Sequence, residues 1–383
     1  MTRDLRLLAA SLFLWGVGEG LFFYIQPVYL AQLGANAVQV GFVLGLAGAA
    51  MTVVHIPAGM LADHFGRKAI MTAAWMFGAV ATVLMFLATT LWPFVAALVL
   101  YSLTAFVVSP LSSYVTEARG PWSVGRALTG VAAAFSAGSV IGPVSGGLLA
   151  AQFGIRPLYG IAALLFVFSS VLVFLLSDQP TEAHHPEGRF RPLLANRTVA
   201  RILVVVFISM LALSLSWPLT PLYLNEVRGL SVAQVGAMGS FFALGIVVLN
   251  LTLGRSPARR GSLIGQVLAA GSVALLWRGM SLPVYAIGYF LAGGTRTARS
   301  LLSAQVERVV ERFHLGLAFG ITETIASSAL IVAPLLAGLL YQRDPASPFP
   351  VSLALIAGSL VLSARLLPAD REREVPVAME QEA

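Results

Sequence analysis

The chain has 383 residues, of which 58% are hydrophobic and 11% are charged. A soluble domain carries about 25% charged residues, so this chain has too little charge to cover the surface of two or three soluble domains. The net charge of +7 could indicate a nucleic-acid-binding protein, but the arginines lie in short segments between apolar runs, so we expect no nucleic-acid partner. The absence of cysteine excludes a disulfide framework and a thiolate metal site.

Apolar runs follow one another along the chain, each long enough to cross a bilayer as a helix. The first continues beyond Leu30, which is too long for a signal-peptide core, so we expect it to be retained as a membrane helix. The pattern predicts an all-α polytopic membrane protein with about 12 transmembrane helices. The runs cover residues 7–33, 37–61, 69–91, 93–115, 127–152, 157–177, 202–224, 232–253, 262–280, 282–305, 315–341 and 350–367.

A polar segment rich in proline and in charges of both signs divides the runs into two sets of six. We therefore predict four parts. They are an N-terminal six-helix bundle (1–177), a cytoplasmic linker (178–201), a C-terminal six-helix bundle (202–368) and a polar C-terminal tail (369–383).

Arginine and lysine alternate in abundance from one connecting segment to the next. If the N-terminus is cytoplasmic, 18 of the 24 basic residues lie in inner segments and four in outer ones. Such a bias is typical of inner loops. We expect a multi-pass protein of the inner (plasma) membrane with both termini in the cytoplasm.

The two halves also resemble each other in sequence. The first run ends Pro27-Val28-Tyr29-Leu30 and is followed by Gln39-Val40-Gly41, whereas the seventh ends Pro221-Leu222-Tyr223-Leu224 and is followed by Gln234-Val235-Gly236. The fifth and eleventh runs share Pro-x-x-x-Gly-Leu-Leu, beginning at Pro143 and Pro334. Parallel six-helix repeats with a binding site between them are a known construction of transporters. We predict two pseudo-symmetric bundles.

Glu19 lies near the middle of the first run, in the stretch Gly16-Val17-Gly18-Glu19-Gly20. An ionisable side chain inside a membrane is costly and is by default a candidate for function. When the halves are aligned on Pro27 and Pro221, Leu213 takes the equivalent position, so the repeated fold does not need an acid there. We favour a functional role for Glu19 over a structural one.

The segment between the second and third runs reads Gly59-Met60-Leu61-Ala62-Asp63-His64-Phe65-Gly66-Arg67-Lys68. It resembles the G-x-L-A-D-x-x-G-R-K/R signature of the major facilitator superfamily, a family of membrane transporters. The resemblance implies the major facilitator fold and a gating role for Gly59, Asp63, Gly66, Arg67 and Lys68 on the cytoplasmic side. We expect Glu117, at the inner end of the fourth run, to form an ion pair with Arg67.

The fifth run contains a stripe of small residues with a proline inside it, namely Gly138, Gly142, Pro143, Gly146 and Gly147. Glycines four apart create a flat face for helix packing, and tight packing alone would explain them. The pattern G-x-x-x-G-P-x-x-G-G also resembles the antiporter motif of drug–proton exchangers in the same superfamily. Gly130 lies one position away from where the longer motif would place a glycine.

Three further charged residues fall within apolar runs: Arg296 and Arg299 in the tenth and Glu323 in the eleventh. At about 1.5 Å of rise per residue, Arg299 and Glu323 each lie about 12 Å from the inner end of their helix. Equal depth predicts an ion pair between them, although Arg299 could instead extend to the membrane interface. In the superfamily, helices 1, 4, 7 and 10 line a central cavity, which implies that Glu19 and Arg296 face the same space.

We predict a secondary transporter rather than an enzyme, with no cofactor and no metal, which uses a proton gradient to export a small solute. In this hypothesis Glu19 takes up a proton on one side and releases it on the other, with Arg296 as its counter-charge. Uptake or uniport of an anionic solute, suggested by Arg296 and Arg299, and a non-transporting sensor or scaffold are the alternatives. We expect a monomer whose partners are the solute and membrane lipid.

Overall fold

In the computed structural model, residues 1–179, 197–308 and 315–368 are described, and side chains are described within these ranges except at 55–65, 108–109, 307–308 and 315–320. The predicted tail (369–383) and most of the predicted linker lie outside the described residues. The described chain forms helices joined by short connections, and α10 begins at Arg197, before the predicted end of the linker.

The six spans of the first half follow the predicted runs closely. They are α1 (Arg3–Phe23) with α2 (Gln26–Gln32), α3 (Ala37–Phe65), α4 (Arg67–Leu87), α5 (Leu91–Leu103) with η1 (Thr104–Val107) and α6 (Val108–Ala118), α7 (Val124–Phe153) and α8 (Arg156–Phe174). The first helix begins four residues before the apolar run because the Thr2 hydroxyl accepts a hydrogen bond from the Leu5 amide and caps it.

The second half repeats this order. Its spans are α10 (Arg197–Ser214) with η2 (Trp217–Leu219) and α11 (Thr220–Glu226), α12 (Val232–Leu253), α13 (Ala258–Arg278), α14 (Leu282–Ala292) with α15 (Gly294–Ser303) and η3 (Ala304–Arg308), α16 (Leu315–Arg343) and α17 (Pro348–Leu366). The predicted fold of twelve spans in two six-helix bundles is confirmed.

Four of the twelve spans, the first, fourth, seventh and tenth, are interrupted helices. Eleven helical stretches of the described chain are long and apolar enough to cross a membrane, and the tenth span, which divides at Gly293 into α14 and α15, is not among them. At this break the backbone of Gly293 packs directly against that of Gly245 in α12, which leaves no room for a side chain. Hydropathy does not register such breaks, because it averages over the whole run.

The glutamine that is repeated in the two halves, Gln39 and Gln234, has the same structural role at the starts of α3 and α12. Asn36 and Gln39 exchange hydrogen bonds between each side chain and the other residue's backbone amide, both at 2.9 Å. Ser231 and Gln234 make the same reciprocal pair in the second half. This capping box satisfies two amides that a helix start leaves without partners, so the repeated glutamine marks the same helix boundary in both halves.

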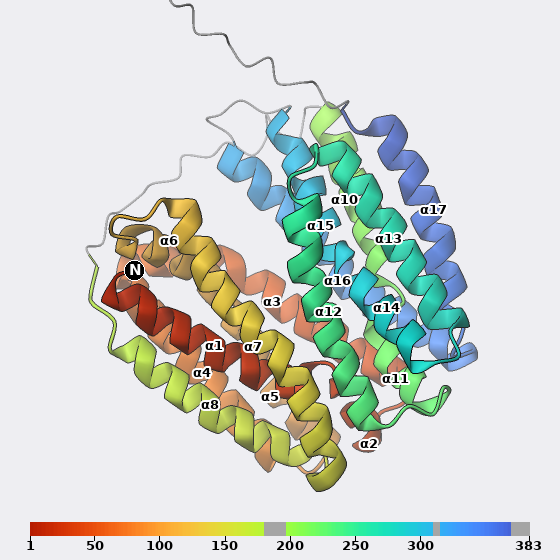
Figure 1. The fold of residues 1–383 in the computed structure, drawn as a ribbon, viewed down its shortest axis with the longest axis horizontal. Coiled ribbons are helices and arrows are strands. Elements are labelled where there is room, and N and C mark those ends of the chain that lie inside the picture. The colour runs from red at the N-terminus through yellow and green to blue at the C-terminus, as the bar shows by residue number, and fades with distance from the viewer. Residues whose placement is uncertain (180–196, 309–314, 369–383) are drawn as a thin grey trace, which may run out of the picture.

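The two halves meet through glycine-lined helix pairs, α3 against α16 and α7 against α12. A Cβ atom at Gly45 would lie 2.8 Å from the carbonyl oxygen of Ile331, and one at Gly147 would lie 2.7 Å from that of Ala233. Small residues let helix backbones approach closely where no water drives association. Figure 1 shows the bundles converging at the end that carries α2 and α11 and diverging toward the end that carries the N-terminus.

The diverging end is called here the arginine-rich face, and it includes the N-terminus, the α3–α4 turn at Gly66, the α6–α7 connection and the α12–α13 connection. The converging end is called the opposite face.

Candidate functional site

A cavity of about 780 Å³ lies between the bundles, and its lining is overwhelmingly apolar and aromatic. Most of its wall comes from spans 1 to 5, and the second half contributes only a few residues near the converging end. Its principal lining residues are Leu12, Trp15, Glu19, Tyr24, Gln26, Trp75, Tyr101, Leu111, Val131, Ala132, Phe135, Trp217, Pro221 and Pro334. Spans 1, 4 and 7 line it as the family resemblance implied, whereas no residue of span 10 is among the lining residues.

Glu19 is a half-buried residue of α1 that lines this cavity. Its glycine neighbours place it there. Gly16 and Gly20 lie against α7, and a Cβ atom at Gly18 would lie 2.6 Å from the ring of Phe166 in α8. Because the glycine side of α1 packs closely against α7 and α8 of its own bundle, Glu19, the one charged residue of this segment, lies on the side of α1 that faces the cavity.

The carboxylate of Glu19 has no counter-ion in contact. Neither of the two ion pairs among the described residues includes it, and the only charge identified as acting on it is that of Arg296, through space. A lone carboxylate in an apolar site is stable only when a proton or a cation neutralises it. Glu19 is therefore a site that either species can occupy.

Aromatic rings around Glu19 form a rigid wall. The rings of Trp15 and Phe166 are stacked with 4.0 Å between centroids, and Trp15 also packs against Trp75 at 5.2 Å. The indole nitrogen of Trp75 donates to the hydroxyls of Ser11 and Ser169 at 2.9 and 2.7 Å. These hydrogen bonds hold the Trp75 ring in place, and Trp75 in turn supports the ring of Trp15.

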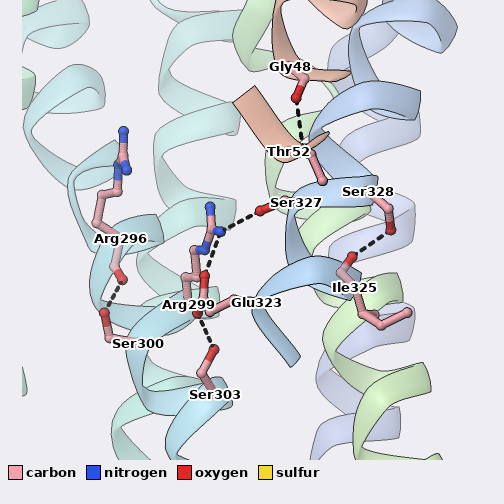
Figure 2. Close-up of polar contacts among 10 residues, drawn as sticks. All are labelled: Gly48, Thr52, Arg296, Arg299, Ser300, Ser303, Glu323, Ile325, Ser327 and Ser328. Atoms are coloured by element: carbon pink, nitrogen blue, oxygen red, sulfur yellow. Dashed lines mark hydrogen bonds and ion pairs between the residues drawn. The ribbon is translucent and has the colours of Figure 1, made fainter. Parts of the chain in front are cut away.

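Arg296 in α15 is exposed, and Figure 2 shows its guanidinium pointing away from the Arg299–Glu323 pair. Its charge acts on Glu19 and on Tyr24, both lining residues, although it forms no ion pair with a described residue. Glu19 and Arg296 thus belong to different halves and are near enough to attract each other without touching.

Arg299 and Glu323 form the ion pair that equal depth predicted. Arg299 Nη2 lies 2.7 Å from Glu323 Oε2 and donates to the Ser327 hydroxyl at 3.0 Å, while the Ser303 hydroxyl donates to Glu323 Oε1 at 2.8 Å (Figure 2). The pair therefore joins the broken tenth span to the eleventh. The prediction of the pair is confirmed.

The motif segment between α3 and α4 lies on the arginine-rich face. Gly66 has a φ of 86°, which glycine adopts without strain, and it forms the turn between α3 and α4. Arg67 and Lys68 begin α4, where Lys68 pairs with Asp178 at 3.3 Å and Arg67 donates to the Gln179 side chain at 3.4 Å. The surroundings of Gly59 and the side chain of Asp63 lie outside the described part of the chain.

The predicted ion pair between Arg67 and Glu117 is wrong for this conformation. The two residues border one small cavity of about 250 Å³, but neither ion pair of the described chain joins them. Arg67 is turned toward Gln179 at the end of the first bundle instead. An exposed glutamate at a helix end retains its hydration, so a weak polar partner is enough to draw the arginine away.

The glycines of the fifth span serve helix packing. Gly138, Gly142 and Gly146 face α1, and a Cβ atom at Gly142 would lie 2.5 Å from the carbonyl oxygen of Val17. Gly147 faces α12 of the other half instead, and the ring of Pro143 lies between Gly20 of α1 and Gly239 of α12. The motif therefore places α7 between the helix that carries Glu19 and the partner bundle.

The sequence analysis missed Gln26, a lining residue that is 4% exposed and whose amide nitrogen has no described partner. A lone glutamine inside an apolar run, directly before Pro27, was the available signal. Among the described residues, no three side chains of types that bind metals gather at one place.

Comparison with known proteins agrees with this architecture. The family model described as Major Facilitator Superfamily matches residues 8–255 and 202–382. Multidrug resistance protein MdtG of Serratia proteamaculans is 27% identical over 59% of this chain and 58% of its own length. An uncharacterized MFS-type transporter of Methanocaldococcus jannaschii, MJ1560, is 23% identical over 78% of this chain and 82% of its own length.

Two solved structures share the fold. The nucleoside transporter NupG superposes with a TM-score of 0.77 at 15% identity, covering 95% of this chain and 98% of that one. The human organic anion transporter MFSD10 gives a TM-score of 0.68 at 18% identity, covering 94% and 99%.

Proposed function

Because this chain belongs to the Major Facilitator Superfamily, we propose that it is a proton-coupled exporter of lipophilic organic cations in a cell inner membrane. The observation that carries the proposal is Glu19, an acid without a contacting counter-ion inside an apolar, aromatic cavity between the two halves. A similarity to proteins named for multidrug resistance supports it.

The chemistry of the cavity matches such a substrate. Aromatic faces attract cations through their ring quadrupoles, and large apolar walls favour substrates that leave water readily. Trp15 and Tyr101 line the cavity with Glu19 and would supply such faces, while Trp75 packs against Trp15. An organic cation bound there would neutralise the carboxylate, which relieves the cost of an unpaired charge in an apolar site.

Coupling follows from the fact that one carboxylate cannot hold a proton and a cation together. A cation that enters the cavity displaces the proton, and a proton that arrives from the other side displaces the cation. Arg296 acts on Glu19 from the opposite half, so a rocking motion changes the separation of these two charges. When Arg296 approaches Glu19, its positive charge would favour release of the cation or proton that is bound to the carboxylate.

The direction of transport rests on the positive-inside rule. The sequence assigns 18 of the 24 basic residues to cytoplasmic segments, and the α3–α4, α6–α7 and α12–α13 connections of that set lie on the arginine-rich face, toward which the bundles diverge (Figure 1). We propose that this conformation receives substrate from the cytoplasm and that a second conformation releases it outside.

The test uses inside-out membrane vesicles that contain the protein and have an acidified lumen. Addition of tetraphenylphosphonium should release protons from the lumen, as reported by a fluorescent pH indicator. Glu19→Gln should abolish this release, whereas Glu226→Gln, the same chemical change at an exposed residue on the opposite face, should preserve it. Full proton release by the Glu19→Gln variant would overturn the proposal.

Arg296 and Arg299 favour a second candidate, the uptake or uniport of an anionic solute. Arg296 is exposed and has no counter-ion in contact among the described residues, so it could bind an anion. Flux of an organic anion that is independent of Glu19 and lost in an Arg296→Gln variant would establish this alternative.

A further inference from the structure

The closed end of the cavity carries a second polar group, the side chain of Gln26. This residue begins α2, directly after the break in the first span and directly before Pro27. It is 4% exposed and lines the cavity beside Trp217, Pro221 and Pro334, which belong to the second half. Gln26 therefore lies where the two bundles meet, beyond Glu19 as seen from the arginine-rich face.

The amide nitrogen of Gln26 is buried without a hydrogen-bond partner among the described residues. Buried polar groups in folded proteins are nearly always paired, because an unpaired donor loses its hydration without compensation. Because Gln26 lines the cavity, rotation of its side chain would bring this unpaired donor to an acceptor that enters the cavity.

The internal repeat shows that this position does not require an unpaired amide. Alignment of the halves on Pro27 and Pro221 places Thr220 at the position equivalent to Gln26. Thr220 is fully buried as well, but its hydroxyl donates to the carbonyl oxygen of Ser216 at 2.8 Å and is satisfied within its own helix. The two halves make the same turn, yet of these two residues only Gln26 has a donor without a partner among the described residues.

We propose that Gln26 is a substrate-binding residue that donates a hydrogen bond to a carbonyl or ether oxygen of the substrate. This inference rests on the proposed function and refines its substrate class. Glu19 and Gln26 are seven residues apart, which corresponds to about 10 Å along a helix. The preferred substrate is accordingly a lipophilic cation whose hydrogen-bond acceptor lies toward the far end of the molecule from its charge.

The test compares two probes of equal charge, tetraphenylphosphonium and (4-acetylphenyl)triphenylphosphonium, which differ by one acetyl group and hence by one carbonyl acceptor. Binding to the purified full-length protein is measured by quenching of tryptophan fluorescence, since Trp15, Trp75 and Trp217 line the cavity. In the Gln26→Leu variant, affinity for the acetyl probe should fall about three- to tenfold, the effect of one net hydrogen bond. Affinity for the parent probe should change less than twofold.

An equal change for both probes, or no change for either, overturns the role of Gln26 while leaving the cation site intact. Failure of both probes to bind the wild-type protein overturns the cation class and this inference with it. Gln26→Met, which keeps the length of the side chain, serves as the second variant if Gln26→Leu does not fold. Both variants should unfold at a temperature no lower than the wild type, because each removes an unpaired buried donor.

Discussion

Arg299 of α15 and Glu323 of α16 form an ion pair, with 2.7 Å between Nη2 and Oε2. The pair links an interrupted span to the continuous one that follows it, and the hydroxyls of Ser303 and Ser327 complete its hydrogen bonds. The side chains are 21% and 49% exposed, so solvent screens much of their attraction.

We predict a small effect of this pair on stability. Glu323→Gln should lower the free energy of unfolding by no more than about 1 kcal/mol, the usual contribution of a partly exposed pair. The double exchange Arg299→Glu with Glu323→Arg should recover part of that loss. Thermal unfolding in detergent measures both, and a loss of several kcal/mol in the single variant would show that the pair is shielded from water.

The glycine-lined contact between α1 and α7 should be far more sensitive to substitution than the Arg299–Glu323 ion pair. In Gly142→Ala the new methyl group would meet the backbone of Val17 and Gly20, neither of which can rotate away. We expect a loss of about 1–3 kcal/mol through overpacking. Gly125→Ala in the same helix is the matched control, because nothing lies within 4 Å of its added Cβ atom. The free energy of unfolding of that variant should be unchanged or slightly higher than that of the wild type. Equal losses of stability at both sites would contradict the prediction that close packing against α1 makes Gly142 sensitive.

Cation binding should depend on pH through Glu19. If a proton and a cation compete for the same carboxylate, as we propose, the apparent affinity for tetraphenylphosphonium should fall as the pH is lowered, by at most tenfold per pH unit. It should become independent of pH once the solution is alkaline enough to leave the carboxylate unprotonated. Titrations of binding between pH 5 and pH 9 measure this, and the Glu19→Gln variant should give a flat profile. A wild-type profile as flat as that of the variant would exclude competition at Glu19.

The lack of cysteine makes access to the cavity directly measurable. Ala132 is exposed and lines the cavity, whereas Ala163 is 5% exposed in the core of the first bundle. In this conformation, a membrane-impermeant thiol reagent should label Ala132→Cys from the arginine-rich face and not from the opposite face. Ala163→Cys should resist labelling from both. Labelling of Ala132→Cys from the opposite face alone would show that the conformation in solution opens the other way.

The arrangement of spans and one side-chain pair could be predicted without the structure. Depth along two helices was enough to match Arg299 with Glu323, because both residues are charged within apolar runs and have few possible partners. The same reasoning failed for Arg67 and Glu117. Both lie at an exposed helix end, where Gln179 and Asp178 are equally available and hydration competes with every contact.

The sequence by itself determined that the chain is a twelve-span membrane protein with two related halves. The free energy of transferring a segment from water to lipid is a sum over the residues of that segment, so it can be calculated without knowing which other helices the segment contacts. The tertiary structure decided which residues line the cavity and which lie against helices. That choice depends on the rotation of each helix about its axis, and the rotation is set by contacts such as Gly16, Gly18 and Gly20 against α7 and α8. Glu19 was therefore visible as a charge in an apolar run, whereas Gln26 became a candidate only when its packed surroundings showed an unpaired donor.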